Sequence, residues 1–343
     1  MVSTRTLMHG SRPLNLYSVF DFEIADYEIQ GGFCQLQLDV AAHIPNGEYT
    51  VDWGDGTIDK LTHYRAWHDF TRAGRYRIRI GPEVKQWRLW ECYTRTSEPR
   101  TLISRPAIFP ICWGDFLESC KGTYCGWTNP DHGGVQGKII PWGRSIKSTF
   151  CCYQFCRDVT GAFPPWTETI EDASATYDGC TNLRGPIPKW GRNIKEVAQC
   201  FCNCPGVYGR FPKWPPGCWE FSSCFKNATG MHGEIPPWPI DAKSLHAAFD
   251  GCTGAVGNIP PWPVGVTDVS YCYRNCANLT GAWTDDPAEL MPEEKLKASP
   301  TADWYRCYEV VLGCSETLRS LFWDKEWGGT IPRPQEEGEV NGD

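Results

Sequence analysis

The sequence predicts a mainly β protein with short helices, in which an N-terminal β-sandwich is followed by a solenoid of 24-residue coils. Glycine recurs every 24 residues from Gly137 to Gly281 without an insertion, and tryptophan recurs with the same period from Trp142 to Trp262. A fixed period of this length is typical of solenoids, in which each coil buries its apolar face against the next coil. Before residue 95, alternating apolar and polar residues predict the sandwich.

Residues 13–95 carry the signals for the β-sandwich. The stretches 33–40 and 75–80 alternate apolar and polar residues, and Gly-Asp-Gly at 54–56 is typical of a tight turn. Asp52 and Asp55 lie at this turn, where they are candidate Ca²⁺ ligands. The favoured interpretation is that Asp55 hydrogen-bonds the backbone of its own turn, as Asx turns do.

Each solenoid coil repeats one order of residue types. A Gly-x-Ile/Phe-Pro piece predicts a strand that ends at proline, which cannot donate to a β-ladder. A segment such as AAFDGCTG (247–254) then predicts a short helical turn closed by glycine. An aromatic column lies inside this predicted turn, at Tyr153, Tyr177, Phe201, Phe225, Phe249 and Tyr273.

The predicted segments cover the whole chain. We expect an N-terminal arm at 1–12, the sandwich at 13–95, a solenoid at 96–334 and an acidic tail at 335–343. Within the solenoid, we expect an atypical unit at 105–136, regular coils at 137–283, an inserted loop at 284–301 and a C-terminal cap at 302–334.

Most of the repeat cysteines fall in two columns of small residues on either side of the aromatic column. Alanine and threonine replace cysteine at some positions of these columns, and neither binds a metal ion. The columns therefore favour buried reduced thiols over disulfides or a zinc site. Cys202 lies in a polar column, and we expect it to be exposed. The predicted structural buried thiols are Cys152, Cys156, Cys180, Cys200, Cys204, Cys224, Cys252, Cys272 and Cys276.

The tryptophan column has two interpretations. It could form an exposed track on which sugar rings or a partner's aromatic side chains stack, which makes its members candidate ligand-binding residues. A structural stack is favoured, because repeated identical apolar columns mostly serve packing. The residues after each tryptophan differ between coils, as expected of a recognition face. The column consists of Trp142, Trp166, Trp190, Trp214, Trp238 and Trp262.

Two parts of the sequence resemble known families. The stretch IPPWPIDAKSLHAAFDGCTGAVGNIPPW (235–262) looks like the BspA-like leucine-rich repeats, although the tryptophan after Ile-Pro departs from their pattern. The stretch YTVDWGDGT (49–57), followed by HDF and GRYRIRI, resembles the polycystic-kidney-disease (PKD) type of immunoglobulin-like domain. The resemblance implies adhesion or partner binding, since such modules occur together in bacterial surface proteins and in phage tail or virion proteins.

Several function classes are disfavoured. The net charge of −8 argues against nucleic-acid binding, and no apolar run reaches the length of a signal peptide or a membrane span. No Gly-x-Ser-x-Gly, His-Glu-x-x-His or phosphate-binding glycine loop occurs, so we expect neither an enzyme nor a cofactor nor a bound metal.

We therefore expect a non-enzymatic binding or adhesion protein that belongs to a larger assembly. The expected setting is a phage virion assembled in the bacterial cytosol, where the chain serves as a tail or decoration component. Its solenoid would recognise a protein or a surface glycan. Two alternatives stay open, namely a decoration protein that contacts only its own assembly and an adhesin at the bacterial cell surface.

Overall fold

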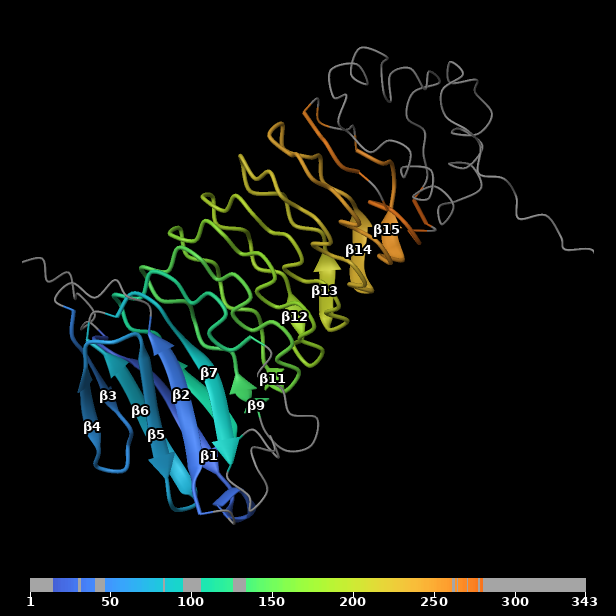
Figure 1. Ribbon diagram of the computed structural model, residues 1–343. Coiled ribbons are helices and arrows are strands. Elements are labelled where there is room, and N and C mark those ends of the chain that lie inside the picture. The colour runs from blue at the N-terminus through green and yellow to red at the C-terminus, as the bar shows by residue number, and fades with distance from the viewer. Residues whose placement is uncertain are drawn as a thin grey trace, which may run out of the picture.

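The computed structural model describes residues 15–29, 32–40, 47–82, 84–94, 106–125 and 134–260, together with most positions from 263 to 279 (Figure 1). The protein is mainly β with almost no helix. Within the described residues the only helical element is the 3₁₀ helix η1 (Asp26–Ile29), and no helix there is long and apolar enough to cross a membrane. The predicted arm, inserted loop, cap and acidic tail lie outside the described residues.

Two sheets form the N-terminal part. The six-stranded sheet has the order β4-β3-β6-β1-β8-β9, and the three-stranded sheet has the order β5-β2-β7. The strands of the two sheets are β1 (Ser18–Ile24), β2 (Cys34–Val40), β3 (Tyr49–Asp52), β4 (Ile58–Leu61), β5 (Arg65–Phe70), β6 (Gly74–Gly81), β7 (Trp87–Thr94), β8 (Ala107–Cys112) and β9 (Gly134–Val135).

Aromatic side chains join the two sheets. The Phe20 ring on β1 lies 5.4 Å from the Trp87 ring on β7, and the Phe22 ring lies 5.4 Å from the Phe70 ring on β5. Alternate residues of β2 are buried, as the apolar–polar alternation predicts. The inner faces of the sheets therefore share one core.

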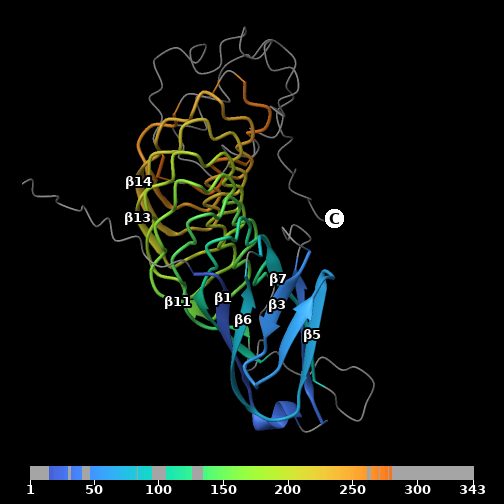
Figure 2. The same ribbon diagram turned by 90° about the vertical axis from the view of Figure 1, so that its left-hand side faces the viewer.

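The N-terminal sheets continue directly into the solenoid. Strand β8 belongs to the predicted atypical unit of the solenoid, yet it pairs antiparallel with β1 and parallel with β9. On the other side of the core, Gln86 forms a parallel bridge with Ser119, which in turn bridges to Ser148 in the first regular coil. A single cluster of buried apolar residues runs through both parts, and in Figure 2 the coils stack on the N-terminal sheets.

The regular coils form a β-solenoid of about five turns. Each coil contributes a short strand that pairs in parallel with its neighbours, first β10 with β11 and then β12-β13-β14-β15 (Figure 1). The strands end before the Ile/Phe-Pro piece instead of including it. These strands are β10 (Gly137–Lys138), β11 (Val159–Thr160), β12 (Gly185–Pro186), β13 (Val207–Arg210), β14 (Gly230–Glu234) and β15 (Gly254–Val256).

The prediction of short helical turns in the coils is wrong. The segments around the aromatic column form a wall of turns, here called the turn wall, in which two columns of residues have a left-handed backbone. In the first column φ is 53° at Cys151 and 54° at Ser223, and the second column contains Asn203, Asn227 and two glycines. The first left-handed column consists of Cys151, Ala175, Gln199, Ser223, Ala247 and Tyr271.

Backbone hydrogen bonds between coils explain this conformation. The N–H of Tyr153 donates to the Thr176 carbonyl at 3.0 Å, and the N–H of Tyr177 donates to the Cys200 carbonyl at 3.1 Å. The N–H of Phe201 does the same toward Cys224 at 2.9 Å. A helix would satisfy these N–H groups within their own segment. The turn wall uses them to hold the next coil.

Equivalent side chains of successive coils stack on one another inside the solenoid. Ring centroids in the aromatic column lie 6.3 Å apart for Tyr153 and Tyr177, and 5.6 Å apart for Tyr177 and Phe201. A second buried column contains isoleucine in the first three coils and smaller residues in the next three. Its members are Ile146, Ile170, Ile194, Cys218, Ala242 and Val266.

We predict that substitution of Gly230 by alanine destabilises the solenoid. A Cβ at Gly230 would overlap the backbone carbonyl oxygen of Val207 in the preceding coil, so the two coils would have to move apart. Such overpacking costs about 1–3 kcal/mol in the free energy of unfolding, measurable by urea denaturation. Asn182→Ala is the matched control, because Asn182 occupies the same position of an earlier coil and is exposed. Equal stability of the two variants would contradict the prediction.

Candidate functional site

The tryptophan column is packed inside the solenoid. Its described members are only 5–9% exposed, at Trp142, Trp166, Trp190, Trp214 and Trp238. Trp262 lies outside the described residues.

Neighbouring indole rings in this column cover one another. The rings of Trp142 and Trp166 are 5.9 Å apart with an interplanar angle of 10°, and those of Trp214 and Trp238 are 5.2 Å apart with an angle of 9°. A sugar ring stacks on the face of an aromatic ring, and these faces are occupied by neighbouring indoles. The described tryptophans therefore form two structural stacks, from Trp142 to Trp190 and from Trp214 to Trp238, with little exposed surface.

The polar atoms of the buried aromatic residues are unevenly satisfied. The indole N–H of Trp238 donates to the Tyr273 hydroxyl at 3.1 Å. In earlier coils the indole N–H groups of Trp166, Trp190 and Trp214 are buried without a hydrogen-bond partner, as is the Tyr177 hydroxyl. Where the aromatic column contains phenylalanine, it offers no oxygen to these donors.

The nine cysteines predicted as buried thiols have no exposed surface. Those that follow the aromatic column donate their S–H groups to backbone carbonyls of the preceding coil. The Cys204 thiol lies 2.8 Å from the Tyr177 oxygen, and the Cys180 thiol lies 3.0 Å from the Tyr153 oxygen. Burial raises the pKa of both thiols and keeps them protonated. These hydrogen bonds between coils could not be derived from the spacing of the cysteines.

Cys202 is also buried, which contradicts the expectation that it is exposed. It is 5% exposed, because Asp178 and Lys226 occupy the same column in the flanking coils and Asn203 donates an N–H to its sulfur at 3.2 Å. Burial, with the nearby Asp178 carboxylate, raises the pKa of Cys202 to about 12. The polar side chains of this column cover one another because they stack from coil to coil.

The carboxylates at the Gly-Asp-Gly turn bind the turn itself. The Thr57 N–H donates to Asp55 Oδ1 at 2.9 Å, which is the geometry of an Asx turn, and His68 Nε2 lies 2.8 Å from Asp55 Oδ2. Asp52 accepts the Gly54 N–H at 3.0 Å and pairs with Arg79 at 2.7 Å. Among the described residues, no group of three or more His, Cys, Asp or Glu side chains is arranged to hold a metal ion.

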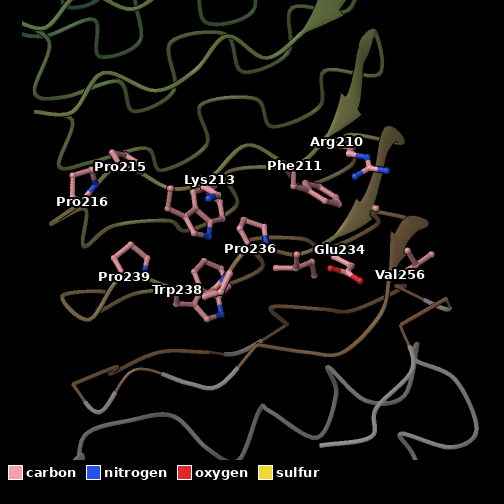
Figure 3. Close-up of a pocket in the computed structure, with 14 residues that line it drawn as sticks. Arg210, Phe211, Lys213, Pro215, Pro216, Glu234, Pro236, Trp238, Pro239 and Val256 are labelled. Carbon is pink, nitrogen blue, oxygen red and sulfur yellow. The ribbon is translucent and has the colours of Figure 1, made fainter.

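An open groove lies on the surface of two adjacent coils. It has a volume of about 880 Å³ and is shown in Figure 3. The edges of Trp214 and Trp238, with Phe211 and Ile235, supply its buried apolar residues. Five prolines also line the groove, at positions 215, 216, 236, 237 and 239.

The prolines are the sequence signal that points to this groove. Trp142, Trp166 and Trp190 are followed by glycine or threonine, whereas Trp214 and Trp238 are followed by proline. Proline has no backbone N–H, so these segments cannot close on one another by complete backbone pairing. The spacing of the tryptophans alone does not reveal this difference between coils.

Two exposed cations lie at the groove. Arg210 and Lys213 line it and form no ion pair with any described residue, while Glu234 contributes one carboxylate from the next coil. Some other cations of the solenoid are paired between coils, for example Arg144 with Asp115 at 3.0 Å and Arg192 with Glu168 at 2.8 Å. The groove therefore combines apolar surface with unpaired positive charge, in a chain of net negative charge.

Comparison with known proteins shows no relative of this chain. No family model, no curated protein and no solved structure matches it.

We predict that Trp214→Ala lowers the free energy of unfolding by about 3–5 kcal/mol, as large-to-small changes in cores do. The matched control is Trp219→Ala, because Trp219 is 39% exposed on the same coil and its loss should cost less than about 1 kcal/mol. Urea unfolding followed by circular dichroism measures both. A Trp214→Ala variant as stable as the control would show that the column does not serve packing.

A second pair of substitutions tests the polar atoms of the core. Tyr273→Phe removes the acceptor of the Trp238 indole N–H and should cost about 1–3 kcal/mol, because a buried donor is then left unsatisfied. Tyr177→Phe removes a buried hydroxyl that has no partner, so it should be neutral or stabilising. The unfolding temperature should fall in Tyr273→Phe and should stay the same or rise in Tyr177→Phe. A larger fall in Tyr177→Phe than in Tyr273→Phe would contradict these hydrogen-bond assignments.

Proposed function

We propose that this chain is a non-enzymatic binding protein whose solenoid recognises a partner through the groove over Trp214 and Trp238. The observation that carries the proposal is the combination, at one open groove, of apolar surface with two cations that have no partner among the described residues. Ligand sites typically combine a mostly apolar lining with a few polar groups that fix orientation.

The partner that fits this groove is an extended segment of another protein. The groove volume of about 880 Å³ falls within the usual range for ligand sites, and its prolines and ring edges suit apolar side chains. Arg210 and Lys213 complement a carboxylate on such a segment. A surface glycan is the weaker candidate, because Trp214 and Trp238 stack on each other and are only 8% and 9% exposed.

The proposed architecture and setting follow the resemblances. We propose that the two N-terminal sheets form a PKD-like β-sandwich and that the coils are BspA-like leucine-rich repeats. The setting proposed with them is a phage virion, in which the chain is a tail or decoration component. Binding of the labelled full chain to purified particles but not to bacterial cells would favour a decoration role, and binding to cells alone would favour an adhesin.

A peptide array tests the groove directly. We expect the full chain to bind peptides in which aspartate or glutamate is flanked by apolar residues, and to bind their lysine-substituted counterparts more weakly. The double variant Arg210→Glu/Lys213→Glu should weaken binding at least about tenfold, equivalent to about 1.4 kcal/mol.

The double variant Lys138→Glu/Arg157→Glu is the matched control, because it changes the net charge equally at exposed positions outside the groove. It should bind like the unchanged chain. Peptide binding that is insensitive to the groove charges, or binding to a glycan array in place of peptides, would overturn the proposal.

A further inference from the structure

Two cysteines near the junction of the N-terminal part and the coils are accessible to solvent. Among the sixteen free cysteines of the described residues, Cys125 is exposed, Cys112 and Cys151 are partly exposed, and the remainder are buried. Neither Cys125 nor Cys151 belongs to the two columns of small residues that flank the aromatic column. Both are accessible to reagents in solution.

The two side chains meet across adjacent segments of the turn wall. The Cys151 thiol donates to the Cys125 sulfur, and the Cys125 thiol donates to Gln154 Oε1 at 3.2 Å. Backbone hydrogen bonds hold the two segments in register. The Gly122 N–H donates to the Phe150 carbonyl at 2.8 Å, and the Tyr124 N–H donates to the Cys152 carbonyl at 2.9 Å.

The pKa values of the two thiols are shifted in opposite directions. The hydrogen bond from Cys151 lowers the pKa of Cys125 to about 7, whereas the same contact together with burial raises the pKa of Cys151. An accessible thiol of low pKa beside a second thiol is the arrangement found in redox-sensitive cysteine pairs. A buried counterpart lies nearby, because Cys152 hydrogen-bonds to Cys120 in the core without access to solvent.

We propose that Cys125 and Cys151 are a redox modification site, at which a low-molecular-weight disulfide converts the two thiols into a disulfide that joins the segment 106–125 to the first regular coil. The Cys125 thiolate attacks one sulfur of the reagent, forms a mixed disulfide and releases one thiolate. The Cys151 thiol then loses its proton to solvent and attacks the Cys125 sulfur, which releases the second thiolate. Two protein thiols are oxidised, and one reagent disulfide is reduced to two thiols.

The disulfide would link the segment 106–125 covalently to the first regular coil. Adjacent coils of a solenoid are otherwise held by non-covalent contacts with their neighbours. A disulfide at this place limits the separation of the two segments in the unfolded chain and should raise the unfolding temperature. The Cys125–Cys151 pair lies outside the groove, whose lining runs from Arg210 to Val256.

Oxidised glutathione is the probe that tests the proposal. The native full chain is incubated with it, free thiols are blocked with an alkylating reagent, and peptides are mapped by mass spectrometry without reduction. We expect a Cys125–Cys151 disulfide as the first product, with the Cys120 and Cys152 thiols still reduced. The initial rate should rise with pH around a midpoint near 7, as the Cys125 thiolate forms.

Single substitutions separate the roles of the two thiols. Cys151→Ala should accumulate a mixed disulfide of Cys125 with glutathione, and Cys125→Ser should leave Cys151 unmodified over the same time. Cys112→Ser is the matched control, because Cys112 is also partly exposed and should not affect the product. Stable glutathione adducts without the disulfide, or a first disulfide between other cysteines, would overturn the proposal.

Discussion

The backbone hydrogen bonds that the aromatic column donates to the next coil set the geometry of the whole solenoid. Because each N–H of this column from Tyr153 to Phe249 donates to the following coil, the coils lie at a fixed separation and in a fixed register. That register places ring over ring at centroid distances such as 5.6 Å between Tyr177 and Phe201, and it places the Cys204 thiol beside the Tyr177 carbonyl. Left-handed residues in the turn wall are the conformational cost of this arrangement.

The same stacking joins the N-terminal sheets to the coils. Trp87 of β7 lies 6.3 Å from Trp113, which lies 6.3 Å from Trp142 in the first regular coil. Strand β8 completes the six-stranded sheet while belonging to the first, atypical unit of the solenoid. A solenoid needs its terminal coils covered, because each coil otherwise exposes an apolar face. The N-terminal sheets provide this cover at one end, so the two parts act as one folded unit.

The 24-residue period predicted the solenoid and the columns, because repetition in sequence implies repetition in space. It could not predict the conformation of the turn wall. The sequence of segments such as 247–254 suits a short helical turn. Their backbone N–H groups donate to the next coil instead of to their own segment, and the helical turn does not form. Burial of Cys202 was missed for a related reason, since a polar column is covered when its members stack. The groove is lined by the prolines that follow Trp214 and Trp238. The repeat pattern does not reveal them, because the earlier coils have glycine or threonine at this position.

The hydrogen bonds of the turn wall also give the solenoid an electrical direction. In the column from Tyr153 to Phe249, every N–H points toward the following coil and every accepting carbonyl points back. Peptide dipoles that align head to tail add up, as they do along a helix, with the positive end on the side of the free N–H groups. Within the turn wall, the side of each aromatic-column segment that faces the following coil presents N–H groups, and the side of the following segment that faces back presents carbonyl oxygens. The two sides of this wall along the solenoid axis are therefore chemically different.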